Sequence, residues 1–246
     1  MSSLAGKKAY VTGASRGIGA AIARRLAAEG ADVAIGYERS GQAAEDLAAE
    51  LRRDGRRAIA VQMSAADPAS VKRAVDQAAA ELGGLDILVN NAGIYRGGPI
   101  EELTLAEVDE VLAVNVRAVV VASQAALAYL PEGGRIVSIG SNLATRVPDP
   151  GASLYALSKS ALIGWTQGLA RDLGPRGITV NIVHPGSTDT DMNPADGPRA
   201  SRQAERTAFK RYGKADDVAA LVAFVAGPQA GSINGTGLTV DGAANA

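Results

Sequence analysis

The feature that most constrains this fold is an alternation of short apolar segments with longer segments of helical periodicity, from about residue 8 to residue 240. The short segments are continuously apolar, as strands buried on both faces of a parallel sheet are. The longer segments carry apolar side chains at helical spacing, as Ile18, Ile22 and Leu26 do. This alternation predicts an α/β fold, a doubly wound parallel sheet with helices on both faces.

The pattern places about seven strands and the helices between them. We predict strands at Lys8–Val11, Asp32–Gly36, Ala58–Gln62, Ile87–Asn90, Arg135–Ile139, Thr179–Val183 and Leu238–Val240. After a first helix around Ile22, we predict helices at Gln42–Arg53, Ser70–Leu82, Leu105–Leu130, Leu154–Leu173 and Asp216–Ala226. The irregular stretch from Pro185 to about Arg199 is a long loop, and such loops in compact domains are usually functional.

Composition and charge exclude several classes of function. The 25 basic and 26 acidic residues give a net charge of −1, so we expect no nucleic-acid partner. Zero cysteines and one histidine exclude a disulfide framework, cysteine catalysis and the common zinc motifs, and we predict no metal site. No apolar run approaches the ~18 residues that span a membrane, and residues 1–8 have no apolar signal core. We therefore expect a cytoplasmic protein with no membrane partner.

A glycine-rich turn, Thr-Gly-Ala-Ser-Arg-Gly-Ile-Gly over residues 12–19, follows the first predicted strand and opens the first predicted helix. Glycine lets the backbone turn sharply and lets a pyrophosphate approach closely. The helix N-terminus adds free N–H groups and the positive end of the helix dipole. This strand–turn–helix context supports a dinucleotide site. We predict cofactor contacts from Gly13, Ser15, Arg16, Gly17, Ile18 and Gly19.

The Gly-x-x-x-Gly-x-Gly spacing and a set of motifs in order along the chain resemble the short-chain dehydrogenase/reductase family. The motifs are Asn90-Asn91-Ala92-Gly93, Asn115, Ser141, the pair Tyr155 and Lys159, Pro185-Gly186 and Val240-Asp241-Gly242. The resemblance covers essentially all 246 residues. It implies a single NAD(P)-binding Rossmann-type domain over residues 1–246, and an enzyme that interconverts carbonyl compounds and alcohols.

The resemblance also implies a catalytic set of Ser141, Tyr155, Lys159 and Asn115. Tyr155 and Lys159 are four residues apart and share one face of a helix. A free tyrosine has a pKa of about 10, and a nearby ammonium is expected to lower it. The family mechanism gives the phenol the proton-transfer role. Lys159 is also expected to hold the nicotinamide ribose, Ser141 to align the substrate carbonyl, and Asn115 to hold a water molecule.

The choice of Ser141 has two alternatives. Ser141 precedes Tyr155 by 14 residues, one more than in most members of the family, and Ser138 and Ser153 are the other candidates. An insertion within residues 142–154, which contain two prolines, would keep Ser141 in place at the end of its strand. We therefore choose Ser141.

The end of the second predicted strand indicates the type of cofactor. Tyr37 stands where NAD-dependent relatives carry Asp, Arg39 and Ser40 follow it, and Arg16 lies in the glycine turn. Two guanidiniums and a hydroxyl suit a 2′-phosphate, so we predict NADP(H) over NAD(H). Glu38 argues against this prediction, because its carboxylate suits the ribose hydroxyl of NAD(H). The resemblance adds contacts from Ser64, Asn91, Ala92, Gly93, Tyr155, Lys159, Pro185, Gly186, Thr188 and Thr190.

Three functions are compatible with these residues. The first is an NADPH-dependent carbonyl reductase or alcohol dehydrogenase with a small-molecule substrate. The second is a 3-oxoacyl–acyl-carrier-protein reductase, although residues 131–134 carry no cation and only Arg176 suits an acidic partner. The third is a non-catalytic regulator, because residues 140–142, 146–148 and 189–195 resemble loops of a family member that binds cyclic-di-GMP. We favour the first, as a homotetramer built through residues 118–130 and 161–170.

The substrate itself is not specified by the sequence. We expect its pocket to involve Tyr95, Arg96, Leu143, Arg146 and residues 186–212, all in loops. The many Arg and Lys side chains of residues 199–214 either attract an anionic substrate or are solvated on a helix, and we favour the solvated helix. We interpret His184 as a structural residue.

Overall fold

The computed structural model describes residues 3–246. Met1 and Ser2, which belong to the predicted domain, lie outside the described residues. The structure confirms a seven-stranded, fully parallel sheet of Rossmann type, in the order β3-β2-β1-β4-β5-β6-β7. The strands are β1 (Lys8–Val11), β2 (Asp32–Tyr37), β3 (Ala58–Gln62), β4 (Ile87–Asn90), β5 (Arg135–Ile139), β6 (Thr179–Pro185) and β7 (Gly237–Val240).

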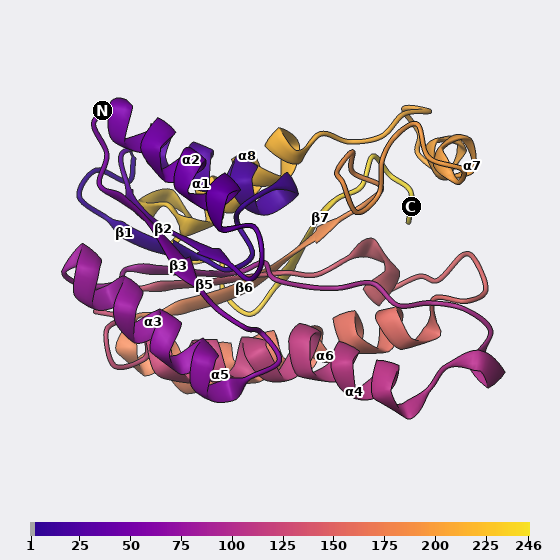
Figure 1. Ribbon diagram of the computed structural model, residues 1–246, viewed down its shortest axis with the longest axis horizontal. Helices are drawn as coiled ribbons and strands as arrows, with labels where there is room; N and C mark the ends of the chain where they lie inside the picture. Colours follow the sequence, from indigo (N-terminus) through magenta and orange to yellow (C-terminus); the bar gives the residue numbers. More distant parts are fainter. Residues whose placement is uncertain (1–2) are drawn as a thin grey trace.

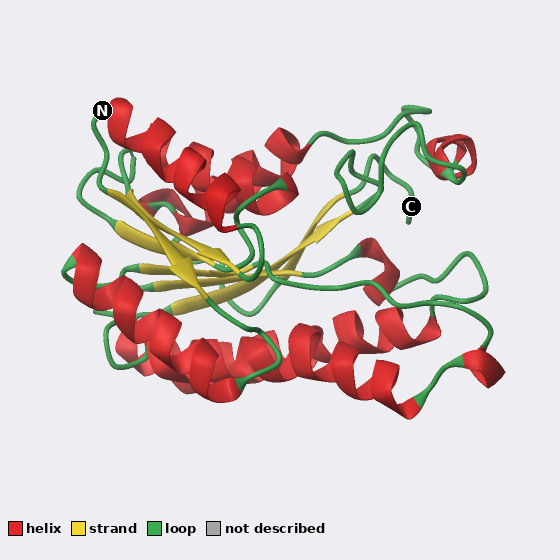
Figure 2. Ribbon diagram, viewed as in Figure 1, coloured by secondary structure: helices red, strands yellow, loops and turns green. Residues whose placement is uncertain are grey.

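Helices cover both faces of the sheet (Figures 1 and 2). One layer contains α1 (Gly17–Ala28), α2 (Gly41–Arg53) and α8 (Ala215–Ala226). The other contains α3 (Pro68–Leu82), α4 (Leu105–Leu112), α5 (Ala118–Ala126) and α6 (Ser153–Leu173). The sheet contributes apolar side chains to a core on each side, which is why its strands are continuously apolar. No helix within residues 3–246 is long and apolar enough to cross a membrane.

Local sequence explains where several helices begin. Asp67 accepts a hydrogen bond from the amide of Ala69, and Pro68 takes the first helical position of α3. Thr104 and Glu107 form a capping box at the start of α4.

The predicted helix over Leu105–Leu130 is not one continuous α-helix. A single π-helical turn, Ala113–Arg117, separates α4 from α5, and α5 ends at Ala126. The turn contains Asn115, whose buried side-chain amide is held by Ile94 on a neighbouring loop. We attribute the wider turn to this tertiary contact. Such π-helical turns are frequent at functional sites, and the apolar periodicity of a sequence does not reveal them.

The order of the strands reverses between β1 and β4, which lie next to each other in the sheet. Open α/β sheets bind ligands at such a switch point, beyond the carboxyl ends of the strands. The loops after β1, β4, β5 and β6 all emerge at this edge. A short helix, α7 (Ala200–Glu205), lies beyond the same edge, at the right of Figure 1.

Candidate active site

The glycine turn presents a helix N-terminus with free donors. Helix α1 begins at Gly17, and no side chain caps its first turn. Gly13 and Gly17 have φ angles of 62° and 56°, in the left-handed region that side chains rarely adopt. A Cβ atom on Gly13 would lie 2.8 Å from the Cα atom of Ala92. The turn therefore needs glycine, and its uncapped N–H groups suit an anion.

The end of β4 is bound tightly to this turn. The Thr12 hydroxyl oxygen accepts hydrogen bonds from the amides of Asn91 and Ala92, each at 3.0 Å. The Asn91 side chain donates to the carbonyls of Thr12 and Gly13, each at 2.9 Å. Asn91 thus holds the glycine turn in shape. Thr12 immediately precedes the first glycine but was not among the predicted site residues.

A cleft of about 860 Å³ runs along this edge of the sheet, a volume within the range of cofactor and ligand sites. Nearly all the predicted site residues line it, which brings together segments far apart in the sequence. They are Gly13, Ser15, Arg16, Gly17, Ile18, Gly19, Tyr37, Arg39, Ser40, Asn91, Ala92, Gly93, Ser141, Tyr155, Lys159, Pro185, Gly186, Thr188 and Thr190. The uncapped helix, the glycine cradle and the size of the cleft together fit a dinucleotide.

Two predicted site residues do not line the cleft. The Ser64 hydroxyl points toward Glu38, whose Oε1 atom lies 3.4 Å away, and Met63 and Ala65 line the cleft in its place. The Asn115 side chain is buried behind the wall. Its amide nitrogen donates to the Ile94 carbonyl and to the Ser158 hydroxyl, at 2.9 and 3.0 Å. Asn115 therefore connects the loop after β4 to helix α6.

The Tyr155 ring and Ser141 both line the cleft wall, and the Ser141 hydroxyl accepts a hydrogen bond from the Leu143 amide at 3.1 Å. Lys159 lies one helical turn further along α6, with its Nζ atom 5.8 Å from the centre of the Tyr155 ring. The Lys159 ammonium is buried and donates to the carbonyl of Ile139, the last residue of β5, at 2.9 Å. Strand β5 and helix α6 thus bring Ser141, Tyr155 and Lys159 to one place.

The electrostatics of Tyr155 differ from the expectation that a neighbouring ammonium lowers its pKa. Burial raises the pKa of Tyr155 to about 12, the nearby Ser141 hydroxyl lowers it, and Tyr95 raises it. Burial also lowers the pKa of Lys159 to about 8. The physical reason is desolvation, which disfavours both charged forms. The phenol is therefore protonated near neutral pH.

His184 anchors the backbone of Ser141. Its ring is buried against Gly140 and Gly237, where an added Cβ would lie 2.5 and 2.9 Å from ring atoms. The His184 Nδ1 atom lies 2.9 Å from the Ser141 carbonyl oxygen and 3.3 Å from its amide nitrogen. Burial lowers the pKa of His184, the Ser141 backbone raises it, and Lys159 lowers it again. These contacts fit the interpretation of His184 as a structural residue, and they hold the backbone of Ser141, a candidate catalytic residue.

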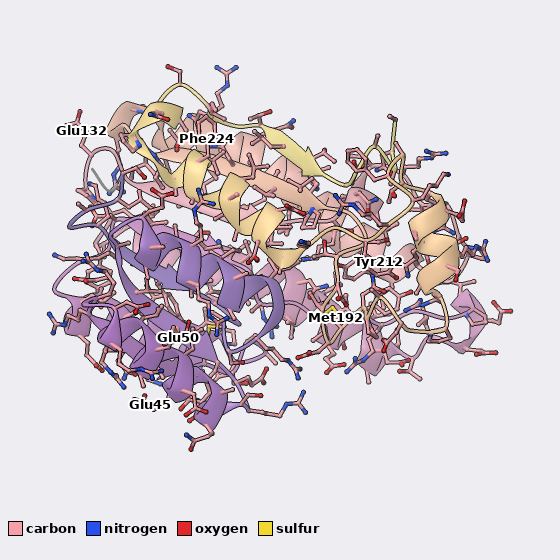
Figure 3. The ribbon with its side chains drawn as sticks, turned by 90° about the horizontal axis from the view of Figure 1, so that it is seen from above. Glu45, Glu50, Glu132, Met192, Tyr212 and Phe224 are labelled. Atoms are coloured by element: carbon pink, nitrogen blue, oxygen red, sulfur yellow. The ribbon has the colours of Figure 1, made fainter. Side chains whose placement is uncertain are left out.

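The part of the cleft beside α7 tests the expected substrate pocket. Of the four individually predicted pocket residues, Tyr95 and Leu143 line the cleft, and several members of the predicted segment 186–212 do so as well. Arg96 instead pairs with Glu110, and Arg146 donates to the Ala244 carbonyl. The lining residues from the predicted segment include Met192, Arg199, Arg202, Gln203 and Arg206, and Asp149 lines this part of the cleft without having been predicted. Figure 3 shows Met192 and Tyr212 toward the same end of the molecule as α7.

The fold and the cleft define the class of this protein as a Rossmann-type protein whose cleft fits a dinucleotide. The family model described as short chain dehydrogenase matches residues 7–200. The chain belongs to the short-chain dehydrogenase/reductase family, and it is an NAD(P)-dependent enzyme of that family.

The particular proteins that it resembles include two with bound cofactor. A short-chain dehydrogenase from Burkholderia cenocepacia, solved with NADP, is 70% identical, with a TM-score of 0.98 over 99% of this chain and 100% of that one. A blue fluorescent protein from a metagenomic library, solved with NADPH, is 54% identical, with a TM-score of 0.98 over 99% and 100%. The cyclic-di-GMP-binding biofilm dispersal mediator protein of Escherichia coli is 45% identical over 99% of each chain.

Proposed function

We propose that this protein uses NADPH to reduce a ketone or an aldehyde to an alcohol, with Tyr155 as the proton donor. The observation that carries the proposal is the grouping of Ser141, Tyr155 and Lys159 at one wall of a cleft whose other end is the glycine turn. Hydroxyl, phenol and ammonium then stand where a carbonyl group beside a bound nicotinamide would meet them.

The residues of the cleft support NADPH as the cofactor. Arg16, Arg39 and Ser40 line the cleft near Tyr37, the last residue of β2. Two carboxylates oppose them: Glu38 lines the cleft beside Arg39, and Asp191 pairs with Arg16 at 3.6 Å. Two guanidiniums and a hydroxyl suit a phosphate better than a free ribose hydroxyl. Of two similar proteins, one was solved with NADP and the other with NADPH. When bound, NADPH supplies the hydride.

Each proposed catalytic residue has a distinct task. The Ser141 hydroxyl holds the substrate oxygen beside the Tyr155 hydroxyl, and Tyr155 gives its proton to that oxygen as negative charge develops. Lys159 is fixed by the Ile139 carbonyl and presents its ammonium to the ribose and to the phenol. Asn115 acts through structure, because it connects the loop after β4 to α6.

The pKa of Tyr155 favours the reductive direction. A phenol with a pKa of about 12 is protonated at neutral pH, so it is ready to donate a proton. The oxidative direction would require the phenolate, which burial disfavours in the free protein.

The experiment that tests the proposal measures NADPH and NADH oxidation against a panel of ketones, aldehydes and 3-oxoacyl thioesters. The Tyr155→Phe variant, which keeps the ring and removes the proton, is assayed in parallel. We expect turnover by the wild type, a lower KM for NADPH than for NADH, and turnover reduced at least roughly a hundredfold in the variant. Equal turnover by the two proteins would overturn the role of Tyr155.

We also propose a homotetramer, built through residues 118–130 and 161–170. Helix α6 exposes Leu157 (56% exposed) on its surface, and α5 and α6 carry many small and apolar side chains. A symmetric interface would bury such surfaces. Light scattering at micromolar concentration should give four times the chain mass of 24.9 kDa, and a monomer mass would refute the assembly.

A second candidate function is binding of cyclic-di-GMP. The Escherichia coli relative with that printed name covers 99% of this chain at 45% identity, which supports the loop resemblance. Calorimetry with cyclic-di-GMP tests this candidate, and no heat of binding would remove it. The carrier-protein alternative has less support, because Arg176 donates to the carbonyls of Leu127 and Leu130.

A further inference from the structure

The far end of the cleft contains an excess of positive charge. Arg199, Arg202 and Arg206 all line the cleft, and they recur at three- and four-residue spacing along α7 and its two flanking residues. Such spacing puts side chains on one face of a helix. The carboxylate that faces them is Asp149, which pairs with Arg202 and Arg206. Three guanidiniums and one carboxylate leave two positive charges at this wall.

The helix that carries these arginines is fixed by other side chains. Gln203 accepts hydrogen bonds from the Ser187 hydroxyl at 2.7 Å and from the Asn193 side-chain amide at 2.9 Å. The Gln203 amide in turn donates to Asn193 at 3.2 Å. Gln203 thus attaches α7 to the loop after β6. The guanidiniums are not needed for that attachment.

Arg199 is connected to the proposed reaction centre through the Tyr95 ring. It stands over the Tyr95 ring, 5.5 Å from the ring centre, and the Tyr95 ring centre is 5.1 Å from that of Tyr155. One aromatic ring therefore separates this cation from the Tyr155 ring. Within residues 3–246, Arg199 forms no ion pair, whereas Arg202 and Arg206 share Asp149. A substrate held at Tyr155 would extend toward an unpaired guanidinium.

We infer that the natural substrate is a carbonyl compound with an anionic group, a carboxylate or a phosphate, about one aromatic ring away from the carbonyl carbon. This inference rests on the proposed reductase function. Arg199 binds the anionic group, and Arg202 turns from Asp149 to share it. Arg202 is free to do so, since 69% of its side chain is exposed. When no substrate anion is present, Asp149 pairs with Arg202 and Arg206.

Matched aldehydes test this inference. Para-carboxybenzaldehyde and para-formylphenyl phosphate carry the two anionic groups, and methyl para-formylbenzoate is the neutral reference. The measured quantity is kcat/KM for each anionic aldehyde divided by that for the neutral ester, in the same protein. A variant that folds incompletely loses both rates together, so the ratio isolates recognition of the anion. The anionic aldehyde with the larger ratio identifies the preferred group.

The variants are Arg199→Gln, Arg202→Gln and Asp149→Asn, with Arg57→Gln as the control. Arg57 is exposed at the opposite end of the sheet, before β3. We expect Arg199→Gln and Arg202→Gln each to lower the ratio roughly tenfold, the effect of one charge-assisted hydrogen bond. Asp149→Asn should raise it by about threefold, because it removes the competing carboxylate. Arg57→Gln should leave it unchanged.

Two results would overturn the inference. One is a ratio that changes less than about twofold in both arginine variants, within the noise of exposed charges. The other is no turnover of either anionic aldehyde by the wild type. The Tyr155→Phe variant separates these failures from failure of the proposed function. If it abolishes reduction of the neutral ester, the reductase stands even when the anion preference is absent.

Discussion

Lys159 should lower the stability of the free protein, because its ammonium is buried for function. Burial lowers the pKa of Lys159 from 10.5 to about 8, which corresponds to about 3 kcal/mol of unfavourable free energy at pH 7. Replacement by methionine removes that cost and also removes the hydrogen bond to the Ile139 carbonyl, which contributes about 1 kcal/mol. We expect Lys159→Met to stabilise the protein by about 2 kcal/mol, or roughly 4–8 °C in Tm.

The effect should depend on pH in a defined way. Below about pH 8 the lysine is charged in both the folded and unfolded wild type, so the cost is fully present. Between about pH 8 and 10.5 the folded protein loses the proton while the unfolded chain keeps it, so wild-type stability rises. The methionine variant lacks this rise. Its advantage should therefore shrink with pH and reverse at about pH 9.5, where the rise in wild-type stability reaches about 2 kcal/mol.

Urea unfolding at pH 7 and at about pH 10, followed by the fluorescence of the single tryptophan, Trp165, measures both effects. Lys72→Met is the matched control, since Lys72 is exposed on α3 and pairs with Asp76. Lys72→Met should not raise the free energy of unfolding at pH 7 in the way expected for Lys159→Met. Its effect on stability should also not fall away toward pH 10. Equal or lower stability of Lys159→Met at pH 7, or an advantage that is constant with pH, would refute the reasoning.

Three further predictions follow from the site. Arg39→Ala should raise KM for NADPH roughly tenfold and leave KM for NADH nearly unchanged in steady-state assays, and equal effects on both would contradict the assigned cofactor. Gly13→Ala should cost at least about 2 kcal/mol in urea unfolding, because its Cβ would press on Ala92; an unchanged midpoint would be unexpected. His184, whose pKa burial lowers, should reduce wild-type stability as pH falls below about 6.5, and His184→Asn should lose this dependence.

The fold was predictable because its signals are local. Each buried strand is a short apolar run, and the predicted strand ranges differ from the observed ones by at most two residues at either end. The glycine turn and the pair Tyr155 and Lys159 are equally local, since spacing along one turn or one helix face defines them. Each of these could be read without knowledge of what lies opposite in the folded chain.

The remaining features depend on contacts between distant segments. The π-helical turn around Asn115 depends on Ile94, and the environment of Ser141 depends on His184. The shifted pKa of Tyr155 comes from burial, which spacing does not report. The sequence predicts that residues 186–212 line the pocket, but it favours solvation of the basic side chains at 199–214. Only the position of α7 shows that Arg199, Arg202 and Arg206 line the cleft.

The most direct test of the central claim follows the transferred hydrogen. NADPH carrying two deuterium atoms at C4 is incubated with the best carbonyl substrate of the panel, and the product is analysed by mass spectrometry and NMR. We expect one deuterium on the carbinol carbon with the wild type, and no product above background with Tyr155→Phe. An alcohol without deuterium, or labelled alcohol formed by Tyr155→Phe at the wild-type rate, would show that NADPH is not the hydride donor or that Tyr155 is not the proton donor.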